Sequence, residues 1–139
     1  MSTGVGGVGI KAKLLEVLPK LMLVGLRRLT DILREFPEAT TRSNLLVLYD
    51  DRDNRVAFWL GFVDGRPKVV EVDPANPPFA TTEVSMHVDT FIKILKGQVD
   101  FIAAYLYDLV DVRSNDGLPP EYHVLLWSAF YDRVANLLK

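Results

Sequence analysis

The chain of 139 residues has no cysteine. This absence excludes disulfide bonds, thiolate nucleophiles and metal sites built on cysteine. Long apolar runs are also missing: the apolar stretch at residues 21–26 is interrupted at once by Arg27 and Arg28, far short of the about 20 residues that cross a bilayer. The first residues lack the basic stretch and apolar segment of a signal peptide. We therefore expect a cytoplasmic protein with no transmembrane segment.

An excess of charge of either sign is absent as well. The chain carries 16 basic and 18 acidic residues, for a formal net charge of -2. General nucleic-acid binding needs a clearly basic surface, and attraction to anionic membranes needs a cluster of lysine and arginine. Neither is found. Hydrophobic residues make up 49% of the chain, which is ample for the core of one domain over residues 1–139.

Motifs of enzymes and cofactor sites lack their structural context. The glycine-rich letters of residues 4–9 match a dinucleotide fingerprint, but only three residues precede them, so no strand can lead into the turn. We interpret residues 1–9 as a flexible tail. Residues 51–54 resemble a calcium loop, yet Val56 stands where that loop requires glycine. No cofactor is expected.

Ser85, His87 and Asp89 alternate along a predicted strand, which invites comparison with a hydrolytic triad. Residues two apart on a strand lie about 7 Å apart, too far for direct proton transfer. We interpret the three as the polar face of a strand, with Asp89 as a helix cap. His87 and His123 also lack the spacing of metal ligands. The sequence thus predicts no catalytic residue and no metal site.

Apolar residues recur at helical spacing over residues 11–36. Pro19 is expected to divide this segment into two helices, and Pro37 to end the second. From Asn44 the apolar period changes to two, which predicts strands at residues 45–49, 56–63 and 68–73. Asp64 and Gly65 predict a tight hairpin between the second and third strands.

The segment from residue 82 to 116 is the most informative part of the chain. Alternating apolar residues predict a strand over 82–88, and Asp89 or Thr90 is expected to cap a following helix. Gly97 supplies the helix stop and Asp100 caps a second turn. Residues 105–113 predict a last strand, and residues 121–138 a closing helix. The order predicts an α+β fold: a mostly antiparallel sheet of roughly five strands, covered by helices.

This element order, with the Asp-then-Phe helix start and the LKGQVD turn, resembles the sterol carrier protein 2 (SCP2) family over residues 43–139. The resemblance implies a lipid-binding tunnel between sheet and helices that the last helix helps to close. It also implies which side chains would line that tunnel: Phe91, Ile94, Leu95, Phe101, Ile102, Trp127, Phe130 and Val134. The same aromatic residues would equally suit an ordinary filled core.

Two functional hypotheses follow. The first is non-enzymatic binding or carriage of a lipid or other apolar small molecule, with transient membrane contact left open. The second is an interaction or dimerisation module with a filled core, for which Leu23, Val24 and Leu26 beside the polar side of the N-terminal helix would supply apolar surface. A homodimer fits this second hypothesis.

Overall fold

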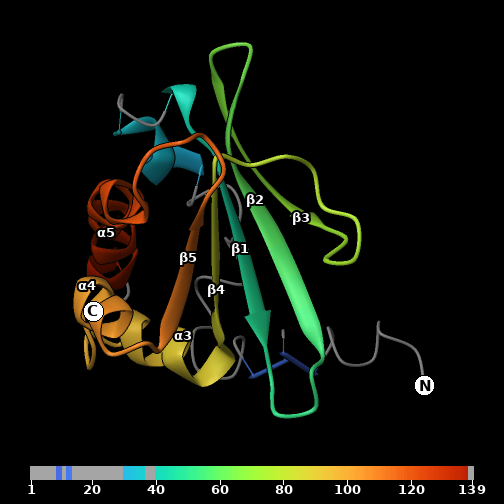
Figure 1. The fold of residues 1–139 in the computed structure, drawn as a ribbon, viewed down its shortest axis with the longest axis vertical. Coiled ribbons are helices and arrows are strands. Elements are labelled where there is room, and N and C mark those ends of the chain that lie inside the picture. Colours follow the sequence, from blue (N-terminus) through green and yellow to red (C-terminus); the bar gives the residue numbers. More distant parts are fainter. Residues whose placement is uncertain (1–8, 11, 14–29, 37–39, 138–139) are drawn as a thin grey trace.

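The computed structural model describes residues 9–10, 12–13, 30–36 and 40–137 (Figure 1). Its named elements follow the chain in the order β1 Asn44–Tyr49, β2 Arg55–Val63, β3 Arg66–Val72, β4 Thr82–His87, α3 Val88–Leu95, α4 Phe101–Leu106, β5 Val110–Ser114 and α5 Pro120–Leu137. Helices α3, α4 and α5 lie together on one side of the sheet (Figure 1). The α+β class expected from the sequence is confirmed.

The sheet has five strands in the order β3-β2-β1-β4-β5. Three neighbouring pairs are antiparallel, but the central strands β1 and β4 run parallel. The expectation of a mostly antiparallel sheet is therefore corrected to a mixed sheet. The cause is the connection over residues 73–81, which returns the chain from the edge strand β3 to the centre. There the Trp59 Nε1–H donates to the Phe79 carbonyl at 3.0 Å.

The predicted turns are confirmed by backbone geometry. Asp64 and Gly65 both adopt positive φ, 52° and 75°, between β2 and β3, as a type I′ hairpin requires. Gly97 has a φ of 73° just after α3. Asp100 caps α4, because its side chain accepts a hydrogen bond from the Ile102 N–H. The sequence predicts these turns and caps correctly because each depends only on residues that are near one another in the chain.

Two boundaries differ from the sequence prediction. The N-cap of α3 is His87, whose Nδ1 accepts from the Asp89 N–H, and not Asp89 or Thr90. The last strand begins at Val110 and not at residue 105, because Tyr105 and Leu106 belong to α4. The cap at Asp100 starts a helix that continues through these residues, and this outweighs their apparent alternation.

The expected N-terminal helices over 11–36 lie mostly outside the described residues and stay a prediction. Residues 12–13 and 30–34 are helical, and so are residues 9–10, so the helical conformation includes Gly9 of the expected tail. Leu23, Val24 and Leu26 lie outside the described residues. Ile10 and Leu33 are buried in the main core.

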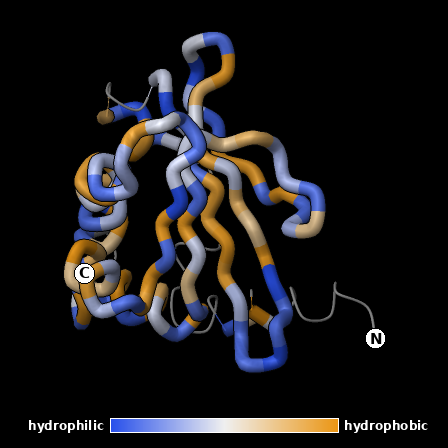
Figure 2. The backbone as a smooth tube through the Cα atoms, in the orientation of Figure 1, coloured by the Kyte–Doolittle hydropathy of each residue, from blue (hydrophilic) through white to orange (hydrophobic). Residues whose placement is uncertain are grey.

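The main core lies between the helices and one face of the sheet. Alternate residues of the strands face it: Leu46, Leu48, Val56, Leu60, Val84, Met86, Val110 and Val112. Figure 2 shows apolar and polar residues mixed along the strands, and a polar turn between β1 and β2. A smaller cluster of Leu45, Ala57 and Ala80, with Trp59 packed against it, covers the opposite face.

A buried polar network fixes α5 to the edge of the sheet. The His123 ring has no exposed surface, and its Nδ1 lies 2.8 Å from the Thr82 hydroxyl. Its Nε2 lies 2.8 Å from an Asp116 carboxylate oxygen, which also accepts from the Ser114 hydroxyl. Arg42 forms an ion pair with the other oxygen of Asp116. A neutral imidazole with its proton on Nε2 can satisfy both of its neighbours.

Core packing predicts a large difference between two leucines. Leu48 has no exposed surface, whereas Leu125 on α5 is 65% exposed. Leu48→Ala should lower the free energy of unfolding by about 2–5 kcal/mol, because it leaves a cavity. Leu125→Ala should change it by no more than about 0.5 kcal/mol. Urea unfolding of the two variants measures both values, and equal losses would contradict this placement of the core.

The network also predicts a pH dependence. Burial alone would raise the pKa of Asp116, but hydrogen bonds from His123, the Leu118 N–H and Ser114 outweigh it and lower the pKa to about 2. Below pH 4 the unfolded chain therefore binds a proton that the folded state resists, so stability falls as the pH falls toward 2. Unfolding measured from pH 5 to 2 should show a smaller fall for Asp116→Asn.

The matched control for that measurement is Asp111→Asn, which removes an exposed carboxylate on the neighbouring strand β5. Its stability should follow the wild-type pH profile. If Asp116→Asn and Asp111→Asn give the same profile, the Asp116 carboxylate does not stabilise the fold through His123.

Candidate functional site

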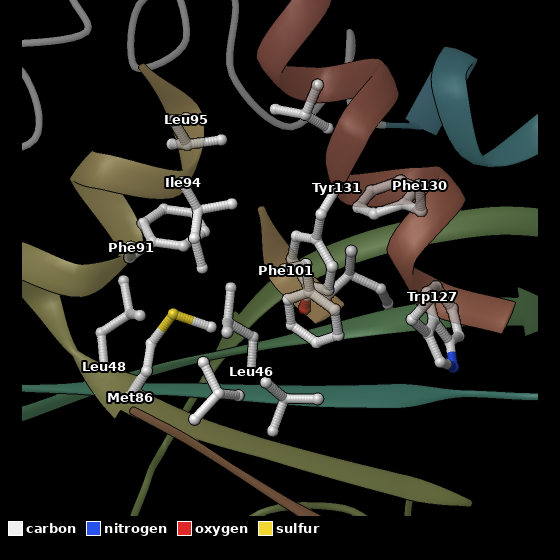
Figure 3. Packing of buried hydrophobic residues seen from close by; sticks show 14 of the residues in the cluster. Leu46, Leu48, Met86, Phe91, Ile94, Leu95, Phe101, Trp127, Phe130 and Tyr131 are labelled. Atoms are coloured by element: carbon white, nitrogen blue, oxygen red, sulfur yellow. The ribbon is translucent and has the colours of Figure 1, made fainter. Parts of the chain in front are cut away.

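The candidate site is the layer between the sheet and helices α3, α4 and α5. The structure brings every predicted lining residue into this one layer. Figure 3 shows Phe91, Ile94, Leu95, Phe101, Trp127 and Phe130 there. Most are buried: Phe91, Ile94, Leu95, Phe101, Trp127, Phe130 and Val134; Ile102 is partly buried against them. They come from three separate helices, so only the fold brings them together. That these side chains line a ligand cavity stays a prediction.

Aromatic rings dominate the part of the layer beneath α5. Phe101 and Tyr131 stack with centroids 4.6 Å apart and an interplanar angle of 21°. Phe130 makes edge contacts with Trp127 at 5.7 Å, with Tyr131 at 5.6 Å and with Phe36 at 6.3 Å. Figure 3 shows the rings of Trp127, Phe130 and Tyr131 on α5, with the Tyr131 ring next to Phe101. Their spacing along α5 follows the helical repeat, which places them on one face.

A row of polar side chains at one end of this layer was missed in the sequence analysis. Asn44 pairs with Thr82 in the β1–β4 register, and Thr82 pairs with Ser114 in the β4–β5 register. Asn44 and Thr82 have no exposed surface. A signal for them existed: Asn44 continues the alternation of Leu46 and Leu48, so it had to face inward.

Two buried polar atoms of this region have no hydrogen-bond partner among the described residues: Asn44 Oδ1 and Trp127 Nε1. The Asn44 amide nitrogen lies 3.3 Å from the Tyr131 hydroxyl. Burial raises the pKa of Tyr131 far above its ordinary value, so its hydroxyl stays neutral. In Figure 3 the Trp127 nitrogen points away from Phe130 and Tyr131. Buried polar atoms without partners are uncommon in folded proteins.

Other candidate chemistry is accounted for by local structure. His87 Nε2 lies 2.8 Å from an Asp51 carboxylate oxygen, while its Nδ1 caps α3. Both ring nitrogens of His87 therefore have partners, and neither is left to accept the proton of the Ser85 hydroxyl. Within the described residues no group of histidine and acidic side chains could hold a metal ion. None of the described helices could span a membrane.

Comparison with known structures supports the expected resemblance. An apo form of sterol carrier protein 2 from Yarrowia lipolytica matches 83% of this chain and 84% of its own, at 12% identity and a TM-score of 0.55. Sterol carrier protein-2 like-3 from Aedes aegypti matches 77% of this chain and 92% of its own, at 15% identity and a TM-score of 0.57.

A crystal structure of sterol carrier protein 2 matches 81% of this chain and 91% of its own, with 19% identity and a TM-score of 0.55. No protein-family model matches the sequence, and a search of curated proteins found no relative. At these identities the likeness shows the fold and not the ligand. The chain therefore has an SCP2-like fold, as the element order of residues 43–139 predicted.

Proposed function

We propose that this protein binds a lipid or another apolar small molecule between its sheet and helices, without catalysing a reaction. The observation that carries the proposal is the aromatic layer under α5, which lies within an SCP2-like fold. The structurally similar proteins are described as sterol carriers, which supports an apolar ligand here as well. The predicted lining residues, from Phe91 to Val134, are the proposed contacts.

Apolar burial can supply the required affinity. Each methylene group removed from water contributes about 0.8 kcal/mol. About ten methylene groups would thus contribute about 8 kcal/mol, which corresponds to a dissociation constant near 1 μM before the costs of ordering. No covalent step or cofactor is needed.

Entry of a ligand requires a helix to move, and α5 is the proposed element. The strands are joined by backbone hydrogen bonds across the whole sheet. By contrast, the described tertiary contacts of α5 are made by side chains: the His123 network at its start, the aromatic rings in its middle and the Arg133–Glu35 ion pair near its end. Separating side chains costs less than breaking a strand ladder, so α5 is expected to open locally.

Fluorescence titration tests ligand binding. A twelve-carbon fatty acid or alcohol should bind with a dissociation constant of about 1–10 μM. It should change the emission of Trp127, which is buried in the layer, because the ring would contact the ligand. Trp59 lies against the cluster on the opposite sheet face, so a Trp59→Phe variant should keep the response and a Trp127→Phe variant should lose it.

The matched ligand control is a short homologue of four carbons, which buries too little surface to bind at these concentrations. An unchanged emission of both tryptophans with several lipid classes, together with no displacement of a fluorescent lipid, would contradict the proposed function.

Amide hydrogen exchange tests the proposed motion. Amides of α5 should exchange faster than those of β4, because α5 can open without disrupting the sheet. Saturating ligand should slow exchange in α5 and leave β4 nearly unchanged, since a ligand that binds the closed form stabilises it. Mass spectrometry of proteolytic fragments measures both segments in one experiment.

A second candidate function is an interaction module with a filled core. It is favoured by large apolar side chains that are exposed at the end of α4, on the α4–β5 connection and on α5: Leu106, Tyr107, Leu109, Tyr122 and Leu125. Exposed apolar side chains mark many protein interfaces where they gather into one patch. Equal and deep protection of α5 and β4, unaffected by any lipid, would favour this alternative over lipid binding.

A further inference from the structure

The polar row Asn44–Thr82–Ser114 runs across three adjacent strands on the helix-facing side of the sheet. Neighbouring strands lie about 4.8 Å apart, so the three side chains stand next to one another. They occupy one end of a layer that is otherwise apolar. A layer that is apolar along its length and polar at one end matches the polarity of an amphiphile, which has an apolar chain and a polar head group.

Three residues of α5 lie above this row at steps of four: His123, Trp127 and Tyr131. Each step of four residues advances about 6 Å along a helix. His123 contacts Thr82 and Ser114, and Tyr131 contacts Asn44. Trp127 lies between His123 and Tyr131 on the same helix face, and its ring is buried in the same core cluster as Tyr131.

Two buried side-chain atoms at this end have no hydrogen-bond partner among the described residues. Thr82, Ser114 and His123 satisfy one another and Asp116. The acceptor Asn44 Oδ1 and the donor Trp127 Nε1 remain without partners among the described residues, although both residues are at most 1% exposed. Leaving such atoms unpaired costs free energy, so a group that pairs with both would bind favourably.

We propose that this polar end binds the head group of a neutral amphiphile, most simply a hydroxyl. The hydroxyl donates to Asn44 Oδ1 and accepts from Trp127 Nε1, and the apolar part of the ligand extends along Phe101 and the α3 side chains. This inference rests on the proposed lipid-binding function and deepens it, because it names the chemical class of the ligand.

The chemistry of the two atoms selects against charged head groups. A carboxylate only accepts hydrogen bonds, so it cannot satisfy Asn44 Oδ1, and an ammonium only donates, so it cannot satisfy Trp127 Nε1. The nearby charged side chains already have partners: Arg42 forms an ion pair with Asp116, and Asp116 also contacts His123. A charged head group would therefore lose its hydration without gaining an ion pair.

Matched ligands test the proposal. We expect 1-dodecanol to bind about tenfold more tightly than its methyl ether, which keeps the acceptor oxygen but has no hydrogen to donate. Dodecanoate at pH 8 should also bind more weakly than the alcohol. Displacement of one fluorescent lipid gives all three dissociation constants. Equal affinities for alcohol and ether would overturn the head-group site while leaving the proposed lipid binding intact.

The indole protons provide a direct readout in the wild-type protein. The chain has two tryptophans, and the Trp59 Nε1–H already donates to the Phe79 carbonyl. In nitrogen–proton correlation spectra, saturating 1-dodecanol should shift the Trp127 indole proton downfield as it gains an acceptor, while the Trp59 signal stays in place. If the Trp127 signal does not shift on binding, the proposal is wrong.

A variant separates the head-group contact from general packing. Asn44→Leu has a similar size and places an apolar group beside Leu46 and Leu60, so it is expected to fold. It should reduce the preference for alcohol over ether from about tenfold to about onefold while it still binds the ether. An unchanged preference would overturn the role of Asn44. If no dodecyl ligand binds the wild-type protein, the proposed function fails together with this inference.

Discussion

The packing of α5 across the helix-facing side of the sheet is the contact on which the rest of the structure depends. The helix covers the apolar side chains of the central strands, contributes Trp127, Phe130 and Tyr131 to the core, and brings His123 onto Thr82. Without it, the apolar sheet face would meet water, and the buried polar atoms of Thr82 and Asn44 would lose their described side-chain partners. Hydrophobic burial supplies most of the attraction, while the polar contacts set the position of the helix along the strands.

This arrangement divides one interface into two chemical regions. Around Phe101 and α3 the layer is apolar, and apolar contacts can be made with apolar groups of different shapes. Around Asn44 and His123 it is polar and specific, because each buried donor or acceptor needs a partner in a defined direction. The polar contacts of His123 and Tyr131 set the position of α5 along the strands, whereas the apolar contacts of the helix require no defined direction. The side chains between α5 and the sheet thus stabilise the fold, and the same side chains are the proposed contacts of an amphiphile.

The same fold context limits what can be carried over from similar proteins. The SCP2-like likeness rests on backbone arrangement at 12–19% identity for the structures compared, so the side chains of the layer are largely this chain's own. Ligand preference depends on such side chains and not on the path of the backbone. The polar row and the unpaired atoms of Asn44 and Trp127 are therefore the features from which a preference of this protein can be argued.

The sequence by itself determined the features that depend on neighbouring residues: the hairpin at Asp64 and Gly65, the stop at Gly97, the cap at Asp100 and the inward face of α5. Local chemistry and periodicity suffice for these. The parallel pairing of β1 with β4, the cap at His87 and the meeting of Asn44, Thr82 and His123 needed the tertiary structure. Residues 44, 82 and 123 are far apart in the chain, and no local pattern records which strands become neighbours. The lining residues were inferred from the resemblance to the SCP2 family, and their contact with a ligand stays a prediction. The polar atoms beside them are defined only by contacts between distant segments of the chain.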